Sequence, residues 1–135
     1  RLRLERQLSD QHIEFTGLVA DLTDIYQLGK IALVPINKNC VIINKAIEAM
    51  AAGLAVVGFD SCFTALSEAN AGEHYLAGNT FSDLAEQINF LLKNPQEAER
   101  IGRSAQQLAE NYYSWSSRAD AFLSLYSPSN MVVAP

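Results

Sequence analysis

Two short apolar runs, with a helical pattern between them, dominate the middle of the chain. The first run is Ile31–Pro35 and the second is Leu54–Val57. Between them the pattern predicts a helix over Asn44–Ala52, which Gly53 ends because glycine interrupts helices. Strand, loop, helix and strand in this order predict a βαβ unit with a parallel sheet.

The predicted helix carries one polar stripe, and its start is a natural place for a ligand. Asn44, Lys45 and Glu48 share a side, since residues three and four apart are neighbours on a helix. Open α/β sheets bind ligands at the carboxyl ends of their strands, where helix N-termini also attract anions. A carboxylate there can accept hydrogen bonds from two sugar hydroxyls, and a lysine one turn earlier can meet a phosphate. A nucleotide-sugar needs this pairing.

The residues before this unit predict one strand and one helix. Ile13–Thr16 alternates apolar and polar residues, as a half-buried strand does. Asp21–Leu28 has the pattern of a short helix, and Gly29 is its expected C-terminal stop. Gly17 ends the predicted strand, where a tight turn alone can require glycine.

The residues after this unit predict a mostly helical region. Thr64–Ala69 indicates one or two helical turns, and Tyr75–Ala77 a short last strand. Ser82 is the expected N-cap of the next helix, and Asn94-Pro95 the boundary between that helix and another. The final helix is expected to be capped by Ser114, to use Trp115 as a packing anchor, and to be followed by a loose tail over 127–135.

The composition fits one globular domain, and the net charge argues against some kinds of binding partner. The chain has 135 residues, of which 49% are hydrophobic and 19% charged, and its net charge is −5. A negative net charge argues against nonspecific binding of nucleic acid or of an anionic membrane through bulk charge. Arg1, Arg3 and Arg6 form a basic cluster, which is interpreted as a solvated helix face or as a membrane-docking patch.

The cysteines and histidines indicate no metal site. Cys40 and Cys62 lack the paired spacing of a zinc site or a disulfide framework, which favours a reduced, cytoplasmic setting. His12 and His74 have no second ligand residue at a recognisable spacing. No apolar run is long enough to span a bilayer, and no signal peptide is visible.

Three stretches resemble one enzyme family over roughly residues 8 to 126. NKAIEAMAAGLAVV resembles the signature K-x-x-E-A-M-A-x-G-x-P-V-V of the family-4 (group 1) retaining glycosyltransferases of the GT-B fold. IEFTGLVADLTDIYQLGKIALVP is similar to the V-x-F-x-G-x-V-x-D-L-x-x-x-Y-x-x-A-x-V-x-L-x-P that precedes it in that family. The Asn-Pro between two helices and Tyr113-Ser114-Trp115 near the end also resemble the family.

The resemblance implies an α/β fold, part of the carboxy-terminal domain of such an enzyme. That domain is a Rossmann-like, doubly wound parallel sheet with helices on both faces. By resemblance, residues 1–126 keep strands three to six and a helical C-terminal region, and lack the first two βα units. In the complete domain, strands one and two lie between strand three and strand four. Without them, that position in the sheet would be empty. A homodimer or a rearranged sheet edge is therefore expected, because open edges promote aggregation.

The resemblance also implies donor-binding residues. Glu48 matches the family glutamate that binds the ribose hydroxyls of the donor, although dipole compensation at a helix start can also explain an acidic residue there. Asn44 and Lys45 precede it on the same helix, where Lys45 is interpreted either as a phosphate contact or as a solvent-facing lysine at the helix start. Gly17 and Leu18 would lie beside the nucleotide base.

The loop before the helix departs from the family pattern. Cys40 stands where the family often carries a second glutamate. Val41, Ile42 and Ile43 stand where it tends to place glycine close to the diphosphate and sugar, and these stiff, bulky side chains narrow the approach. The loop 37–43 is nevertheless expected to face the phosphates.

The function implied is retaining transfer of a hexose from a UDP- or GDP-sugar to a glycan or lipid acceptor, as in polysaccharide biosynthesis. No cofactor and no metal are expected, no catalytic residue is assigned, and the isolated chain is expected to be inactive. Its partners would be the nucleotide-sugar and an N-terminal acceptor domain that this sequence lacks; the full enzyme can associate peripherally with a membrane. The alternative is a non-catalytic, degenerate nucleotide-binding or protein-interaction module.

Overall fold

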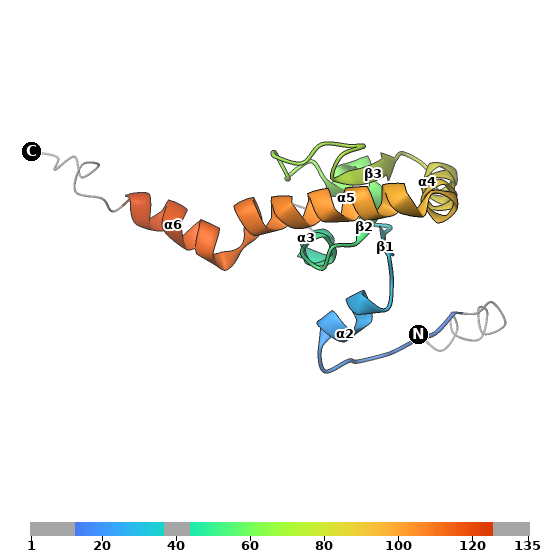
Figure 1. The fold of residues 1–135 in the computed structure, drawn as a ribbon, viewed down its shortest axis with the longest axis horizontal. Coiled ribbons are helices and arrows are strands. Elements are labelled where there is room, and N and C mark those ends of the chain that lie inside the picture. The colour runs from blue at the N-terminus through green and yellow to red at the C-terminus, as the bar shows by residue number, and fades with distance from the viewer. Residues whose placement is uncertain (1–12, 37–43, 126–135) are drawn as a thin grey trace, which may run out of the picture.

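A computed structural model describes residues 13–36 and 44–125 (Figure 1). In chain order, its elements are the helix α2 (Leu22–Gln27), the strand β1 (Ile31–Val34), the helix α3 (Asn44–Ala51), the strand β2 (Ala55–Phe59), the 3₁₀ turn η1 (Asp60–Cys62), the strand β3 (Tyr75–Gly78), the helices α4 (Phe81–Lys93) and α5 (Pro95–Leu108), the π-helical turn η2 (Ala109–Tyr113) and the helix α6 (Trp115–Leu125). The predicted tail over 127–135 lies outside the described residues.

The three strands form one parallel sheet in the order β1-β2-β3. Ile31 is paired with Ala55 at the start of β1, and Val56 with Tyr75 at the start of β3. All five residues of the central strand β2 are buried, as expected for a strand covered on both faces. The predicted βαβ unit is therefore confirmed: β1, α3 and β2 follow each other as the apolar runs indicated.

Small residues let α3 and α5 approach the sheet and each other closely. Ala46, Ala49 and Met50 of α3 are almost fully buried. Gly53 ends α3 with a φ of 78°, in the left-handed region that favours glycine, as predicted. A side chain on Gly102 of α5 would overlap the carbonyl oxygen of Gly53, so the two backbones touch there. The core of the molecule is centred on this contact and on β2.

The start of α4 differs from the prediction. The N-cap is Thr80 rather than Ser82, because the Thr80 hydroxyl accepts a hydrogen bond from the Asp83 amide, at 3.2 Å. In return the Asp83 carboxylate accepts from the Thr80 amide, at 2.9 Å, which completes a capping box. The backbone bonds to the carboxylate, those from Asn79 and Thr80, lower the pKa of Asp83.

The boundary between α4 and α5 falls where the sequence placed it. Asn94 is the cap residue between the two helices, and Pro95 is the first residue of α5. The amide side chain of Asn94 does not cap α5; it donates to the carbonyl of Phe90, at 2.8 Å, and so closes the end of α4.

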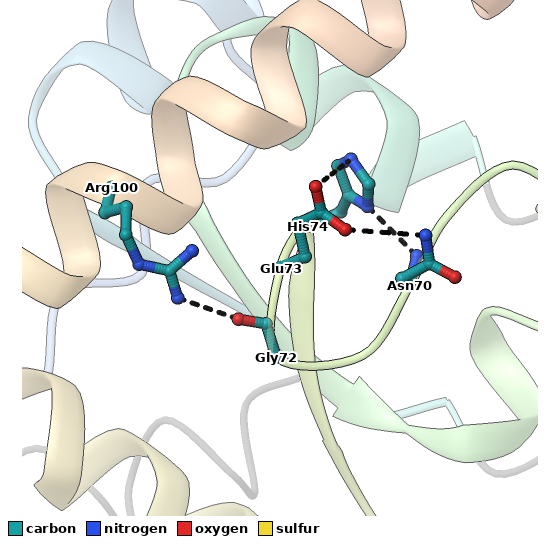
Figure 2. Close-up of polar contacts among 5 residues, drawn as sticks. All are labelled: Asn70, Gly72, Glu73, His74 and Arg100. Atoms are coloured by element: carbon teal, nitrogen blue, oxygen red, sulfur yellow. Dashed lines mark hydrogen bonds and ion pairs between the residues drawn. The ribbon is translucent and has the colours of Figure 1, made fainter.

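The connection between β2 and β3 is built from turns. The predicted helical turns over Thr64–Ala69 are not formed; the backbone bonds here span three residues, such as Leu66 N–H to the Phe63 carbonyl. Figure 2 shows how the end of this connection is held. His74 accepts a hydrogen bond from the Asn70 amide through Nδ1, at 3.0 Å. Arg100 of α5 donates to the carbonyl of Gly72, at 2.8 Å.

The predicted strand over Ile13–Thr16 is wrong. The segment has no strand pairing in the structure, and Ile13 and Phe15 are partly exposed. A strand needs hydrogen-bond partners along at least one edge, and no strand of the described residues lies beside this segment. Within residues 13–36 and 44–125 the sheet therefore has three strands rather than the four expected, and the segment does not form a rearranged edge. The homodimer stays a prediction.

The last helix is also placed differently from the expectation. Ser114 does cap α6, since its hydroxyl accepts from the Ser117 amide at 3.1 Å. Trp115, however, is 93% exposed, so it anchors no packing in this structure. Figure 1 shows α6 extending past the sheet beyond α5. Trp115 is not part of the core cluster of the described residues, so the prediction that it anchors the packing is wrong.

The predicted stop of α2 is only partly confirmed. The helix ends at Gln27, with Leu28 as its cap in the ordinary helical conformation. Gly29 does not adopt the left-handed φ expected of a glycine stop. Its amide still donates to the carbonyl of Tyr26, at 3.3 Å, which satisfies one free carbonyl of the helix end.

Candidate functional site

The candidate site is the exposed side of α3 together with α2. Because β1 is parallel to β2, the chain leaves β1 at the ligand-binding edge of the sheet before it enters α3. Asn44, Lys45 and Glu48 are all exposed on α3, while the opposite side of this helix is buried in the core. The polar stripe predicted from the sequence therefore faces solvent.

Glu48 contacts a residue that the sequence did not assign to the site. The hydroxyl of Tyr26 on α2 donates a hydrogen bond to Oε2 of Glu48, at 3.2 Å. Burial of the Tyr26 ring, followed by this bond and the charge of Glu48, raises the pKa of Tyr26. The bond occupies one side of one oxygen, so most acceptor positions of the carboxylate stay open to a ligand.

Tyr26 lines several grooves, two of which contain a residue of the polar stripe on α3. The first, here called the Glu48 groove, has a volume of about 310 Å³. It is lined by Leu22, Thr23, Tyr26, Glu48, Ala51 and Ala52. The second, here called the Lys45 groove, has a volume of about 400 Å³ and is lined by residues 32–36, Tyr26, Lys45 and Ala49. Tyr26 is thus the wall that the two grooves share.

The chemistry of this arrangement suits a polar ligand with hydroxyl and anionic groups. The Glu48 groove offers a carboxylate that can accept from hydroxyl groups, beside apolar surface from Leu22 and the alanines. The Lys45 groove offers one ammonium group at the start of α3 above mostly apolar residues. In the described part of the chain, no three His, Cys, Asp or Glu residues lie close enough to hold a metal ion.

The remaining predicted site residues are not joined to α3. Gly17 adopts a φ of 73° and Leu18 is fully exposed, and neither makes a hydrogen bond with α3 in the structure. Figure 1 shows the segment before α2 set apart from the sheet. Cys40, Val41 and Ile42 lie outside the described residues, as does the whole loop 37–43. Their predicted roles stay predictions.

Tyr26 is the residue that sequence reasoning missed. The helical pattern of Asp21–Leu28 assigns this residue no role in the site. The signal for it was present, because the tyrosine of the quoted D-L-x-x-x-Y stretch is Tyr26. The pairing with Glu48 spans 22 residues, and no local spacing rule connects residues so far apart.

No described helix is long and apolar enough to cross a membrane.

A model of a protein family matches most of the chain. The model described as "Glycosyl transferases group 1" matches residues 1–94, which contain β1, α3 and the whole candidate site. No curated protein sequence matches this chain.

A solved structure has a similar fold. It is the C-terminal domain of a glycosyl transferase group 1 family protein (LpcC) from Francisella tularensis. The TM-score is 0.70 at 21% sequence identity, over 84% of this chain and 62% of that one. This chain therefore spans about three fifths of the length of the domain it resembles. At this identity the likeness shows the fold: a Rossmann-like α/β domain of the GT-B type.

Proposed function

The chain belongs to the group 1 glycosyl transferases, and from this premise we propose that it supplies the nucleotide-binding half-site of a hexosyltransferase. The donor would be a UDP- or GDP-sugar, transferred with retention at the anomeric carbon to a glycan or lipid. The observation that supports this most is the exposed carboxylate of Glu48 in a groove at the ligand-binding edge of a parallel sheet.

Glu48 is the residue proposed to bind the ribose. Its carboxylate accepts from hydroxyl groups, and the two neighbouring hydroxyls of a ribose can both donate to it. Lys45, one turn earlier on the same helix, is proposed to meet the diphosphate, with Asn44 beside it. Catalysis in such an enzyme consists mostly of positioning the donor and stabilising the charge of the leaving diphosphate.

The acceptor site is proposed to belong to another domain. The matched structure is the C-terminal domain of its protein, which supports a two-domain arrangement for this family member as well. The isolated chain is then expected to bind a nucleotide without transferring a sugar, and the complete enzyme to act in the cytoplasm, associated peripherally with a membrane. The homodimer would use the outer edge of β1, where no described strand lies.

Calorimetric titration of the 135-residue chain with UDP and GDP tests this proposal. One of the two nucleotides should bind, and Glu48→Ala should weaken it about tenfold or more, because hydrogen bonds to a charged group are lost. The matched control is Glu86→Ala, which removes an exposed glutamate from α4 and should leave the affinity unchanged. The absence of binding, or equal affinities for both variants, would overturn the proposal.

A further inference from the structure

The hydroxyl of Tyr26 lies against the carboxylate that the proposed function assigns to the ribose. Tyr26 comes from α2 and Glu48 from α3, and the hydrogen bond between them spans 3.2 Å. Glu48 is an exposed side chain with several rotatable bonds. Fixing such a side chain costs conformational entropy, so a bond that orients it before the ligand arrives raises affinity.

Tyr26 is itself held firmly enough to orient its partner. It packs against the buried core cluster although it belongs to a helix with no buried residue. Its ring also forms the wall between the Glu48 and Lys45 grooves. A tyrosine side chain has few rotatable bonds, so fixing it costs little conformational entropy. Its phenol hydroxyl can then donate to Glu48 from a defined position.

The alternative is that Tyr26 competes with the ligand for Glu48. An ionised carboxylate has about four acceptor positions, and Tyr26 uses one of them, on Oε2. Within the described residues, no other hydrogen bond uses this carboxylate, and Glu48 is an exposed residue that lines the groove. The two hydroxyls of a ribose therefore do not need to displace the phenol.

We propose that Tyr26 is a positioning residue, whose hydroxyl holds the Glu48 carboxylate in the orientation that accepts the ribose diol of a nucleoside diphosphate. This inference rests on the proposed function, because it takes Glu48 as the ribose-binding group. It adds a residue from α2 to the site and assigns the selectivity for a ribose with both hydroxyls to the Tyr26–Glu48 pair.

The test uses the 135-residue chain and pairs each nucleotide with an analogue that lacks the diol. UDP and GDP, and their 2′,3′-dideoxy forms, are titrated into the wild type and Tyr26→Phe. The phenylalanine keeps the ring that packs on the core and removes the hydroxyl. Affinity for the ribonucleotide should fall about tenfold, whereas affinity for the dideoxynucleotide should not change. Tyr112→Phe, at an exposed tyrosine of η2, is the matched control.

Two further variants separate positioning from a general structural effect. In a Glu48→Ala background, Tyr26→Phe should have no additional effect, since the hydroxyl acts through that carboxylate. A purely structural role would weaken the ribonucleotide and the dideoxynucleotide equally, and would overturn the inference. Tighter ribonucleotide binding by Tyr26→Phe would show competition and overturn it as well.

The outcomes also distinguish this inference from the proposed function. If the wild type binds a ribonucleotide and Tyr26→Phe binds it equally, the positioning role fails while the proposed function stands. If the wild type binds neither UDP nor GDP, the proposed function fails, and the role of Tyr26 fails with it.

Discussion

Helices α5 and α2 both lie against α3, α5 through a close backbone approach at Gly53 and a hydrogen bond from Gln106, and α2 mainly through one side chain. Gly102 of α5 lies so close to the Gly53 carbonyl that no side chain fits between them, and the surrounding residues are buried. The described contacts of α2 with α3 centre on Tyr26, which bonds Glu48 and lines the same groove. One side of α3 is therefore fixed by close packing of backbone, and the other mainly by a single side chain, that of Tyr26.

This difference in packing explains why the candidate ligand-binding site lies between α2 and α3 rather than between α3 and α5. Close-packed interfaces have few alternative arrangements, whereas elements held by few buried contacts open at low free energy. The candidate site lies at the weaker interface. Binding elements are commonly drawn from such regions, because the cost of adjusting them to a ligand is small.

The largest effect is expected from Gly102→Ala. Alanine is the better helix former, but its methyl group would overlap the backbone of Gly53, and neither element can move away without opening the core. The free energy of unfolding should fall by about 3 kcal/mol, measured by urea denaturation.

Gly29→Ala is the matched control for this change. The added methyl group would lie 3.5 Å from Cδ2 of Leu54, an ordinary contact. Stability should then stay within about 0.5 kcal/mol of the wild type. Equal losses for the two variants would contradict the claim that the α3–α5 interface is the tight one.

A smaller effect is expected from Tyr26→Ala. It removes a partly buried ring and the bond to Glu48, so α2 should lose its main attachment to α3. The global free energy of unfolding should fall by only about 1 kcal/mol, while hydrogen exchange in α2 becomes much faster than in α5. Tyr26→Phe should keep most of the protection. Uniformly faster exchange in both helices would show that α2 is part of the tight core.

The smallest effect is on the titration of Tyr26. Its pKa is raised above the ordinary value of 10.0, so the neutral phenol favours the folded state. The resulting stabilisation is complete below about pH 10 and is lost as the pH rises through the raised pKa. In Glu48→Gln the carboxylate charge is gone, and Tyr26 should titrate at lower pH than in the wild type. NMR of the tyrosine ring carbons measures this, and an unchanged titration would mean that the two side chains do not meet.

The elements with strong local signals could be predicted from the sequence. The two apolar runs and Gly53 determined β1, α3 and β2, and Asn94-Pro95 determined the break between α4 and α5. The predicted N-cap of α4, Ser82, lies two residues after the observed N-cap, Thr80, because serine and threonine are both good cap residues. The choice between them depends on the reciprocal bond with Asp83.

The elements that depend on distant partners could not be predicted. The alternation of Ile13–Thr16 suits a strand, but pairing also requires a neighbour, and none of the described strands is one. Trp115 was expected to be buried because large aromatic residues usually are, yet α6 extends beyond the elements that could cover it. In the candidate site, the stripe on α3 followed from helical spacing, whereas the contact between Tyr26 and Glu48 depends on the tertiary fold.

The most direct test of the central claim is an NMR titration of the ¹⁵N-labelled chain with UDP and GDP, which detects weak binding and locates it. If Glu48 and Tyr26 form the nucleotide half-site, saturable shifts should appear at the amides of α2 and of the first turns of α3, and the amides of α5 should not shift. Shifts centred on α5, or no saturable shifts with either nucleotide, would contradict the claim.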